Sequence, residues 1–437
     1  MYQRLSFGAT LIVFMLLSVA ARAQDRAASP PVLRMESQPA GAVVSLRGCV
    51  HFDYLGYDRD EIMLSKETGS QENDFIVRRA RLYFQGKLGD LVGFYVQAGL
   101  EIPEYPFLDA FVILNVAPGV QVRAGQLKMP FSQERLRSYL HQPVMERSPA
   151  AMLELRRSQG IILSVAPGDG GLMGELGLFT GENMNQHNTD DHFEYVGRFT
   201  FKPDKAIDGF PGSGQIAASA AYGRRDPERS PTTSFVGRTM NNFTWFQAIP
   251  VGGYRTRYEA DAEWRYRSLF IAGEWIQSTE ERENVTVNVD TDGDGASDGT
   301  YTDTLDPIEE YGWYGMFVWA LTGEDYNEYI VPKSDWGAVS LVVRYGEVHF
   351  DAGDLPAAAE TALGSNHVRE VNSVSTTLGR EDVSAGVSEL YVGFDWDLKQ
   401  GAFVQFAALW QWYGDSSPFG DDRTGDINYR ARIGVVF

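Results

Sequence analysis

The stretch from Arg255 to Arg267 alternates between two kinds of side chain at every position. Its seven odd-numbered residues are all charged, and its even-numbered residues after Thr256 are tyrosine, alanine or tryptophan. Successive side chains of a β-strand point to opposite faces, so this segment predicts a strand with one ionic face and one apolar face. A soluble β-sandwich has little use for a line of charges, whereas a transmembrane barrel sets such charges in a water-filled lumen and its apolar face against lipid.

Alternating runs of about ten residues recur along the chain, separated by turn residues. Counting them gives sixteen strands, and bacterial outer-membrane barrels have an even number of strands. We therefore predict an all-β fold, a transmembrane antiparallel β-barrel of about sixteen strands. The predicted strands are 43–57, 74–87, 92–101, 108–117, 120–128, 160–166, 172–181, 192–202, 214–225, 255–267, 269–281, 310–323, 336–350, 387–398, 402–413 and 427–437.

The connections between these strands sort by length. If both chain ends lie on the periplasmic side, most long connections face outward and most short ones inward, as in bacterial barrels. The exceptions are two mid-length inward connections, 203–213 and 324–335, and one short outward connection, 102–107. The chain also ends on Phe437, and a C-terminal aromatic residue in an alternating strand is typical of such barrels. These features predict a location in the bacterial outer membrane. The predicted outward connections are 58–73, 102–107, 129–159, 182–191, 226–254, 282–309, 351–386 and 414–426.

The first residues have the layout of a secretory signal peptide. A basic start is followed by an apolar core from Leu11 to Val19 and by small residues at Ala21 and Ala23. We expect residues 1–23 to be a cleaved signal peptide. Residues 24–42 contain three prolines and predict an extended periplasmic segment. The remaining residues, 43–437, form the predicted barrel.

Composition excludes several other classes of protein. The chain has 59 acidic and 38 basic residues and a net charge of -21, which argues against a nucleic acid partner because phosphate backbones require clustered positive charge. The absence of a second long apolar run excludes a helical membrane protein. A single cysteine, Cys49, excludes a disulfide within the chain and a metal site built on several cysteines.

Several segments resemble the phosphate-selective porin O and P family. Phe75 to Gly86 and Phe94 to Val96 are similar to its second and third strands, and Val122 to Glu134 is similar to the strand that leads into its long third loop. The resemblance covers most of the mature chain. It implies a sixteen-stranded channel in the outer membrane, assembled as a homotrimer, in which the third outward loop folds into the pore and sets its narrowest point. Shorter similarities lie at Glu146 to Ser148, Arg156 to Gly160, Tyr195 to Phe199 and Trp336 to Tyr345.

The alternation also places arginines on the lumenal face of many predicted strands. The charge of arginine is permanent, and its planar guanidinium pairs with two oxygens of an oxyanion at once. A row of arginines would let a small anion pass from partner to partner without one deep trap. The predicted pore-lining anion path consists of Arg79, Arg81, Arg123, Arg198, Arg265, Arg344, Arg430 and Arg432.

The third outward loop, 129–159, is the predicted constriction. Just before it, strict alternation from Arg123 places Lys128 on the outward face of its strand. Either a bulge turns it inward or it serves the subunit interface. The arginines that the loop would bring to the constriction are Arg135, Arg137, Arg147, Arg156 and Arg157.

The predicted function is the diffusion of small anions, phosphate or polyphosphate among them, through an outer-membrane porin. One alternative is that the arginines only pair with carboxylates such as Glu134, Glu146 and Glu259, which would suit a general porin or one selective for carboxylates, sugars or cations. The scarcity of lysine weakens the phosphate assignment, because the phosphate-selective members of the resembling family gather lysines near the mouth and wall. A barrel enzyme is the remaining alternative, but the histidines have no obvious serine partner, so we expect no catalysis.

One outward connection carries a spacing of carboxylates that is typical of calcium loops. Positions one, three, five and nine are aspartates, and position six is Gly295. Position twelve is Tyr301 instead of a bidentate glutamate, so the sequence predicts either a weak extracellular calcium site or a solvated acidic loop. No other cofactor is expected. The aspartates of this run are Asp290, Asp292, Asp294 and Asp298.

Overall fold

The computed structural model gives the fold of most of the predicted barrel. Among the described residues, no helix is both long and apolar enough to cross a bilayer. The predicted signal peptide, 1–23, lies outside the described ranges, and in the predicted segment 24–42 only β1 (Leu33–Ser37) and Ala42 lie within them. The described residues are 33–37, 42–57, 73–102, 106–181, 184–226, 234–238, 244–290, 299–327, 330–351, 369–370, 384–413 and 425–437.

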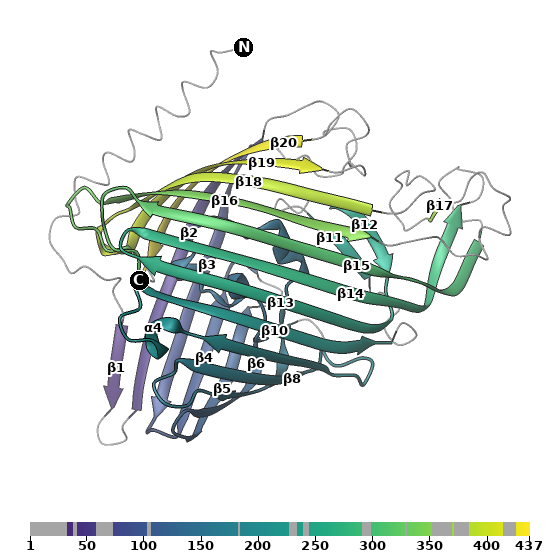
Figure 1. Cartoon of the computed structure of the whole chain (residues 1–437), viewed down its shortest axis with the longest axis horizontal. Helices are drawn as coiled ribbons and strands as arrows, with labels where there is room; N and C mark the ends of the chain where they lie inside the picture. The colour runs from purple at the N-terminus through teal and green to yellow at the C-terminus, as the bar shows by residue number, and fades with distance from the viewer. Residues whose placement is uncertain are drawn as a thin grey trace, which may run out of the picture.

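Sixteen antiparallel strands close into a barrel, as predicted (Figure 1). Each strand pairs with its neighbours along the chain, and the first barrel strand, β2, pairs with the last, β20, so that no edge remains open. Closure is what lets a sheet satisfy all of its backbone hydrogen bonds in lipid. The barrel strands are β2 (Ala42–Tyr57), β3 (Asp74–Leu88), β4 (Val92–Gly99), β5 (Phe107–Ala117), β6 (Val120–Lys128), β7 (Arg157–Val165), β8 (Leu172–Phe179), β9 (Glu194–Phe201), β10 (Ser213–Arg225), β13 (Gly253–Tyr266), β14 (Leu269–Asp290), β15 (Gly299–Ala320), β16 (Ala338–Asp351), β18 (Ser384–Asp397), β19 (Ala402–Tyr413) and β20 (Gly425–Val436).

The predicted alternation holds in the fold. Along β13, Tyr258 is 53% exposed on the outside of the barrel, whereas its neighbour Arg257 is 7% exposed and faces inward. The same division gives the other strands outward side chains such as Phe199, Ile216 and Phe406, which are exposed although apolar. A continuous apolar exterior of this kind is the surface that a barrel presents to lipid.

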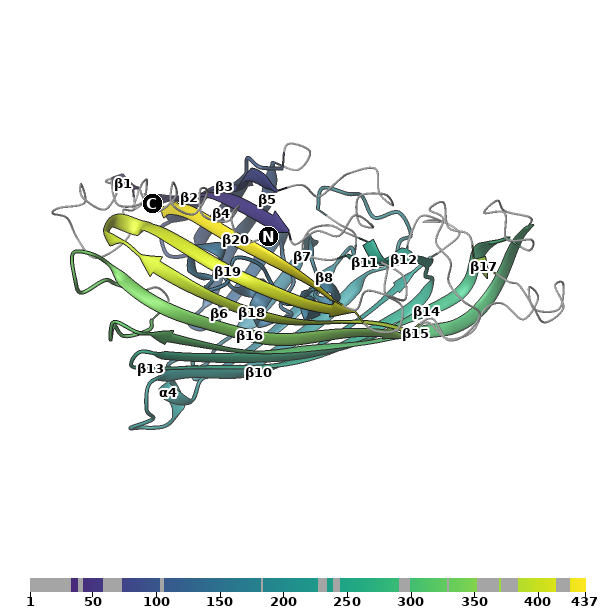
Figure 2. The same cartoon turned by 90° about the horizontal axis from the view of Figure 1, so that it is seen from above.

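Four further strands extend the sheet or lie beside it. β1 pairs with the start of β2, β17 (Arg369–Glu370) pairs with the end of β14, and β11 (Ser234–Arg238) and β12 (Thr244–Pro250) form a separate hairpin. The prediction of a loop over 282–309 was wrong for much of its length, because β14 runs on to Asp290 and β15 begins at Gly299. Figures 1 and 2 show these two strands projecting beyond their neighbours. Residues 291–298, which connect the two strands, lie outside the described ranges.

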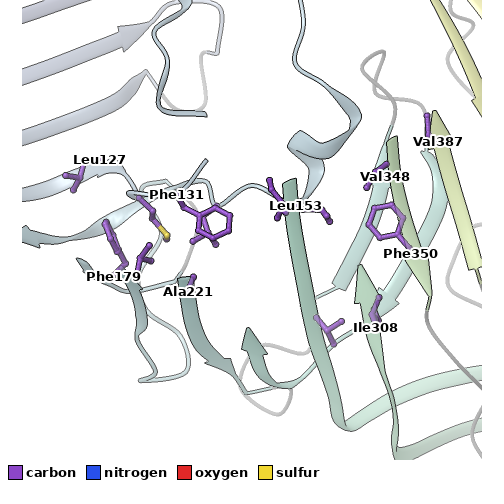
Figure 3. Close-up of a cluster of buried hydrophobic side chains, with 14 of the residues drawn as sticks. Leu127, Phe131, Leu153, Phe179, Ala221, Ile308, Val348, Phe350 and Val387 are labelled. Atoms are coloured by element: carbon purple, nitrogen blue, oxygen red, sulfur yellow. The ribbon is translucent and has the colours of Figure 1, made fainter. Parts of the chain in front are cut away.

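Residues 129–156, here called the lumenal loop, fold inside the barrel. The loop contains three short helices, α3 (Gln133–Leu136), η1 (Tyr139–His141) and η2 (Pro149–Leu153). Its apolar residues pack on inward residues of the wall, and Figure 3 shows Phe131 and Leu153 between side chains from opposite parts of the barrel. The inner wall is therefore not uniformly ionic, since β15, β16 and β18 contribute Ile308, Val348, Phe350 and Val387 to this cluster.

Candidate functional site

Glu146 fixes the lumenal loop to the barrel wall. Arg78 donates to both of its carboxylate oxygens, at 2.5 and 2.8 Å, and Arg430 donates to one of them at 3.1 Å. Arg79 and Arg432 lie within 3.6 and 3.9 Å. Burial alone would raise the pKa of the Glu146 carboxyl, but the guanidinium groups of Arg78 and Arg79 hold this pKa well below its usual range. The loop is thus held by an ionised carboxylate that four wall arginines share.

Arg78 was not among the predicted lumenal residues, and a β-bulge explains why it faces inward. His51 of β2 pairs with Arg79, but the next residue, Phe52, pairs with Val77, so Arg78 is an extra residue in β3. The bulge lets Arg78 and Arg79 reach the same carboxylate. A signal was present in the sequence: the odd positions 75 and 77 before Arg78 are apolar, whereas 79 and 81 after it are arginines.

A second anchor joins Glu134 of the loop to Arg344 of β16. The Glu134 carboxylate accepts hydrogen bonds from the backbone N–H and the hydroxyl of Ser148, at 3.0 and 2.7 Å, and from Arg344 at 3.3 Å. Arg344 also donates to the backbone oxygen of Glu146 at 2.7 Å and to Glu389 of β18 at 2.7 Å. Arginine from the wall therefore binds both the side chains and the backbone of the loop.

Four arginines surround Tyr139 of the loop, and these five residues are here called the Tyr139 cluster. The Cζ atoms of Arg79, Arg81 and Arg147 lie 3.9, 4.6 and 4.9 Å from the centre of the tyrosine ring. Arg135 lies near enough for its charge to act on the phenol. Burial raises the pKa of a tyrosine, but the charges of Arg147 and Arg79 outweigh this effect and lower the pKa of Tyr139 to about 7.

Positive charge exceeds negative charge in the Tyr139 cluster. Three carboxylates approach its four arginines: Glu101 lies 2.6 Å from Arg81, Glu146 lies 3.6 Å from Arg79, and Glu154 lies 3.6 and 3.9 Å from Arg147 and Arg135. Several guanidinium nitrogens of the cluster are buried and have no hydrogen-bond partner among the described residues. These nitrogens are Arg79 Nε, Arg81 Nη1, Arg135 Nε, and Arg147 Nε and Nη2.

Each of the eight arginines predicted to form the anion path has a carboxylate within 4 Å. Arg123 pairs with Glu175, and Arg198 pairs with Glu259 and Asp261 at 2.9 and 2.6 Å. The geometry therefore matches the alternative in which the arginines pair with carboxylates of the wall and the loop, and their part in solute passage stays a prediction. The remaining pairs are Arg79, Arg430 and Arg432 with Glu146, Arg432 also with Asp53, Arg81 with Glu101, Arg265 with Glu263, and Arg344 with Glu134 and Glu389.

The five arginines predicted for the constriction are placed differently from one another. Arg135 and Arg147 belong to the Tyr139 cluster, whereas Arg137 crosses to Glu263 of β13. Arg157 is the first residue of β7 and pairs with both oxygens of Asp109, each at 2.8 Å. Arg156 is exposed. The loop thus brings two of the five together on one side of the lumen.

Lys128 points to the lumenal loop, which agrees with the inward alternative and not with strict alternation. Its ammonium group donates to the backbone oxygens of Leu136 and Arg137, at 3.1 and 3.2 Å. Lys128 is the last residue of β6, where the chain leaves the strand for the lumenal loop. Three residues earlier, Gly125 has a φ of +142°, which is open to glycine but not to other residues.

Further inward residues of β13 were not singled out by the sequence reasoning. Arg255 binds Glu194 through two contacts of 2.8 Å, and Arg257 binds Glu280 at 2.5 Å. Both are odd-numbered residues of the same strand as Arg265, which the alternation placed on the lumenal face. The alternation could therefore have identified them too. Nearby, both carboxylate oxygens of Glu310 are buried without a hydrogen-bond partner in the described part of the chain.

The predicted calcium site is not tested. Asp292, Asp294 and Asp298 lie outside the described residues, and so does the side chain of Asp290. Within the described ranges, no group of three or more histidine, cysteine, aspartate or glutamate side chains could hold a metal ion. Calcium binding at this connection stays a prediction.

Comparisons with known proteins agree on the kind of molecule. The model of a family described as phosphate-selective porin O and P matches residues 44–381. A search of curated protein sequences found no match. Among solved structures, outer-membrane expressed OmpT of Vibrio cholerae is 8% identical, with 93% of this chain and 100% of that chain covered and a TM-score of 0.53. The outer membrane channel DcaP of Acinetobacter baumannii is 11% identical, with 92% and 99% covered and a TM-score of 0.52. At these identities the two structures show a shared fold.

Proposed function

The chain belongs to the phosphate-selective porin O and P family, and from this premise we propose that its channel passes small anions, phosphate among them. It is an outer-membrane porin with a closed barrel of sixteen strands. Which solute the lumen favours depends on the charges that face the solute at the loop.

The observation that carries the proposal is the excess of arginine in the Tyr139 cluster. Its guanidinium groups are held in place by the wall and by the tyrosine ring, yet they keep nitrogens without a partner in the described structure. An oxyanion offers the acceptors that these nitrogens lack, and arginine pairs with such oxygens in a fixed geometry. The cluster would therefore stabilise an anion beside the loop.

The negative charge of the whole chain does not oppose this proposal. The field at the narrowest part of a channel governs passage, and low-dielectric walls strengthen it there. In the lumen most carboxylates are already paired with arginine, as Asp53 is with Arg432 at 2.7 Å. What an anion meets at the loop is the local excess of positive charge.

A porin for cations is the second candidate, and the wall around β13–β15 favours it. Carboxylate oxygens of Glu259, Glu274 and Glu310 are buried there without a hydrogen-bond partner in the described ranges. A cation passing along this wall would find acceptors, just as an anion would find donors at the Tyr139 cluster. The two candidates predict opposite signs of selectivity.

Reversal potentials separate the two candidates. The purified porin in a planar bilayer under a KCl gradient should prefer chloride to potassium, and Arg147→Gln should lower this preference about fivefold, which corresponds to roughly 1 kcal/mol of charge interaction. Arg224→Gln serves as the matched control, because Arg224 is exposed at the outer end of β10. Preference for potassium in the unmodified porin would reject the anion proposal. Repeating the measurement with phosphate and sulfate then ranks the oxyanions.

Three further proposals concern the mature protein. Residues 1–23 are removed as a signal peptide, three copies assemble in the outer-membrane lipid, and the channel catalyses no reaction. The family resemblance supports the trimer, and the apolar exterior supports contact with lipid. N-terminal sequencing of the protein from outer membranes tests the first proposal, and the mass of the detergent-solubilised particle tests the second.

A further inference from the structure

A cavity of about 70 Å³ lies between the lumenal loop and the inner wall. Tyr139 and Gln142 of the loop border it on one side. The wall contributes His51 of β2, Ser340 of β16, and Asp395 and Asp397 of β18. Tyr139 also belongs to the Tyr139 cluster, but the other side chains that line the cavity are not members of that cluster.

Several polar atoms around this cavity have no hydrogen-bond partner in the described structure. His51 is 2% exposed and both of its ring nitrogens are unpaired, and Ser340 is 1% exposed with an unpaired hydroxyl. The amide of Gln142 and one carboxylate oxygen of Asp395 are unpaired as well. Buried polar groups are normally paired, so four such side chains around one cavity indicate that something outside the chain completes them.

The charges around the cavity disfavour an ion of either sign. Asp395 and Asp397 form no ion pair within 4 Å in the described ranges, and their carboxylates would repel an anion. Arg432 lines the same cavity with its charge compensated by Asp53, and the arginines on the Tyr139 ring lie close by. These guanidinium groups, together with the N–H donors of Gln142 and His51, would repel a cation or leave it poorly bound.

The unpaired groups include both donors and acceptors. A hydroxyl group can donate to the carboxylate of Asp395 and accept from the amide of Gln142, whereas chloride and sulfate have no donor and an ammonium group has no acceptor. Apolar surface is also present, since Phe403, Tyr326 and Val144 line the cavity. Small-molecule sites combine such apolar walls with a few placed polar groups.

We propose that this cavity is a binding subsite for a small neutral polyhydroxylated solute, of the sugar or sugar-alcohol class. The subsite goes beyond the anion path, and it depends on the porin fold but not on the sign of its ion selectivity. A solute held there would sit beside the loop and narrow the route for ions.

The test is block of ion current by a neutral sugar. Single channels of the full porin are recorded in KCl with glucose, with glycerol, or with poly(ethylene glycol) of matched size at the same bulk conductivity. Glucose or glycerol should lower the conductance more than the polymer does. Ser340→Ala and Asp395→Asn should each raise the half-blocking concentration about three- to tenfold, the effect of losing one hydrogen bond. Ser158→Ala, at a buried serine of β7 that bonds Thr180, is the matched control.

Three outcomes would overturn the proposal. The first is equal block by glucose, glycerol and the polymer. The second is block that neither Ser340→Ala nor Asp395→Asn changes, and either variant suffices if the other does not fold. The third is stronger block by methylammonium than by glucose, which would make the cavity a cation site. Reversal potentials of the same channels report the anion preference separately, so failure of one proposal is distinguishable from failure of the other.

Discussion

Tyr139 carries a titratable group in the midst of the arginines that would attract an anion. Its pKa is about 7, lowered by Arg147 and Arg79 against the effect of burial. Below this pH the phenol is neutral and the excess of arginine charge over carboxylate charge in the cluster remains. Above it the phenolate adds a negative charge, so the preference for chloride over potassium should fall as the pH rises from 6 to 8. Reversal potentials measured across this pH range check the prediction.

Tyr139→Phe should remove this pH dependence and keep the anion preference at its low-pH value. Tyr429→Phe is the matched control, because Tyr429 is exposed on the outer face of β20 and should leave the pH profile as it was. A flat profile in the unmodified porin would contradict the prediction. So would a profile that Tyr139→Phe leaves intact, since the change in charge between pH 6 and 8 would then come from another group.

Gly125 is the other residue at which a single change should have a large effect. A Cβ atom at this position would lie 2.3 Å from the backbone oxygen of Ala110, and the φ of +142° is strained for any other residue. We expect Gly125→Ala to lower the free energy of unfolding by about 1–3 kcal/mol. Gly174→Ala is the control, because nothing lies within 4 Å of a Cβ there and its φ is ordinary. Denaturant unfolding followed by tryptophan fluorescence measures both, and equal stabilities would disprove the argument.

For single residues, the sequence correctly predicted whether a side chain faces the lumen or the exterior wherever the alternation was unbroken. Arg257 and Tyr258 face as their positions require. It failed at Arg78, where one extra residue breaks the alternation, and at Lys128, the last residue of β6, where the chain leaves the strand for the lumenal loop. Such local breaks depend on how a strand pairs with its neighbour. The pattern within one segment therefore does not reveal them.

The lumenal loop is an element whose position depends on ion pairs with the wall. We expect Glu146→Gln to leave Arg78, Arg79, Arg430 and Arg432 without their shared carboxylate. Breaking a buried ion pair in this way should lower the free energy of unfolding by about 3–5 kcal/mol. The loosened loop should also raise the current noise of the open channel, and the unpaired arginines should strengthen its anion preference.

Single-channel recording and denaturant unfolding together test this anchoring role. Glu309→Gln is the control, because Glu309 is exposed and its loss should change neither measurement. If Glu146→Gln gave a channel as quiet and as stable as the unmodified porin, Glu146 would not hold the loop. Glu134 and its bonds to Arg344 would then be the principal anchor.

Whole strands were predictable because each strand alternates in sequence, with one face toward lipid and the other toward the lumen. The ends of β6, β14 and β19 at their short turns match the predicted bounds, since a turn interrupts the alternation sharply. The extension of β14 and β15 beyond the barrel was missed, because a hairpin in water has no lipid face to enforce alternation. The packing of Phe131 and Leu153 against the inner wall was missed for a different reason: it joins segments far apart in the chain.

At the scale of the molecule, the exterior is divided into an apolar band and aromatic borders. On β13 the border residues are Tyr258, toward the outer end, and Trp264, toward the periplasmic turns, with small apolar residues between them. Aromatic girdles at both interfaces and an apolar band between them are features of outer-membrane barrels. Outward aromatic residues toward the outer ends of other strands are Tyr195, Tyr222, Trp412 and Tyr429.

This arrangement predicts that the effect of a charge on the exterior depends on its depth. Ala260 faces outward between the two borders of β13, so Ala260→Arg should lower the free energy of folding into lipid vesicles by about 2–4 kcal/mol. Tyr254 is outward as well but lies near the outer end of the strand, and Tyr254→Arg should cost only about 0–1 kcal/mol. Urea titration of the vesicle-bound porin measures both. Equal costs would mean that Ala260 does not face hydrocarbon, because only a low-dielectric band distinguishes two exposed positions on one face of one strand.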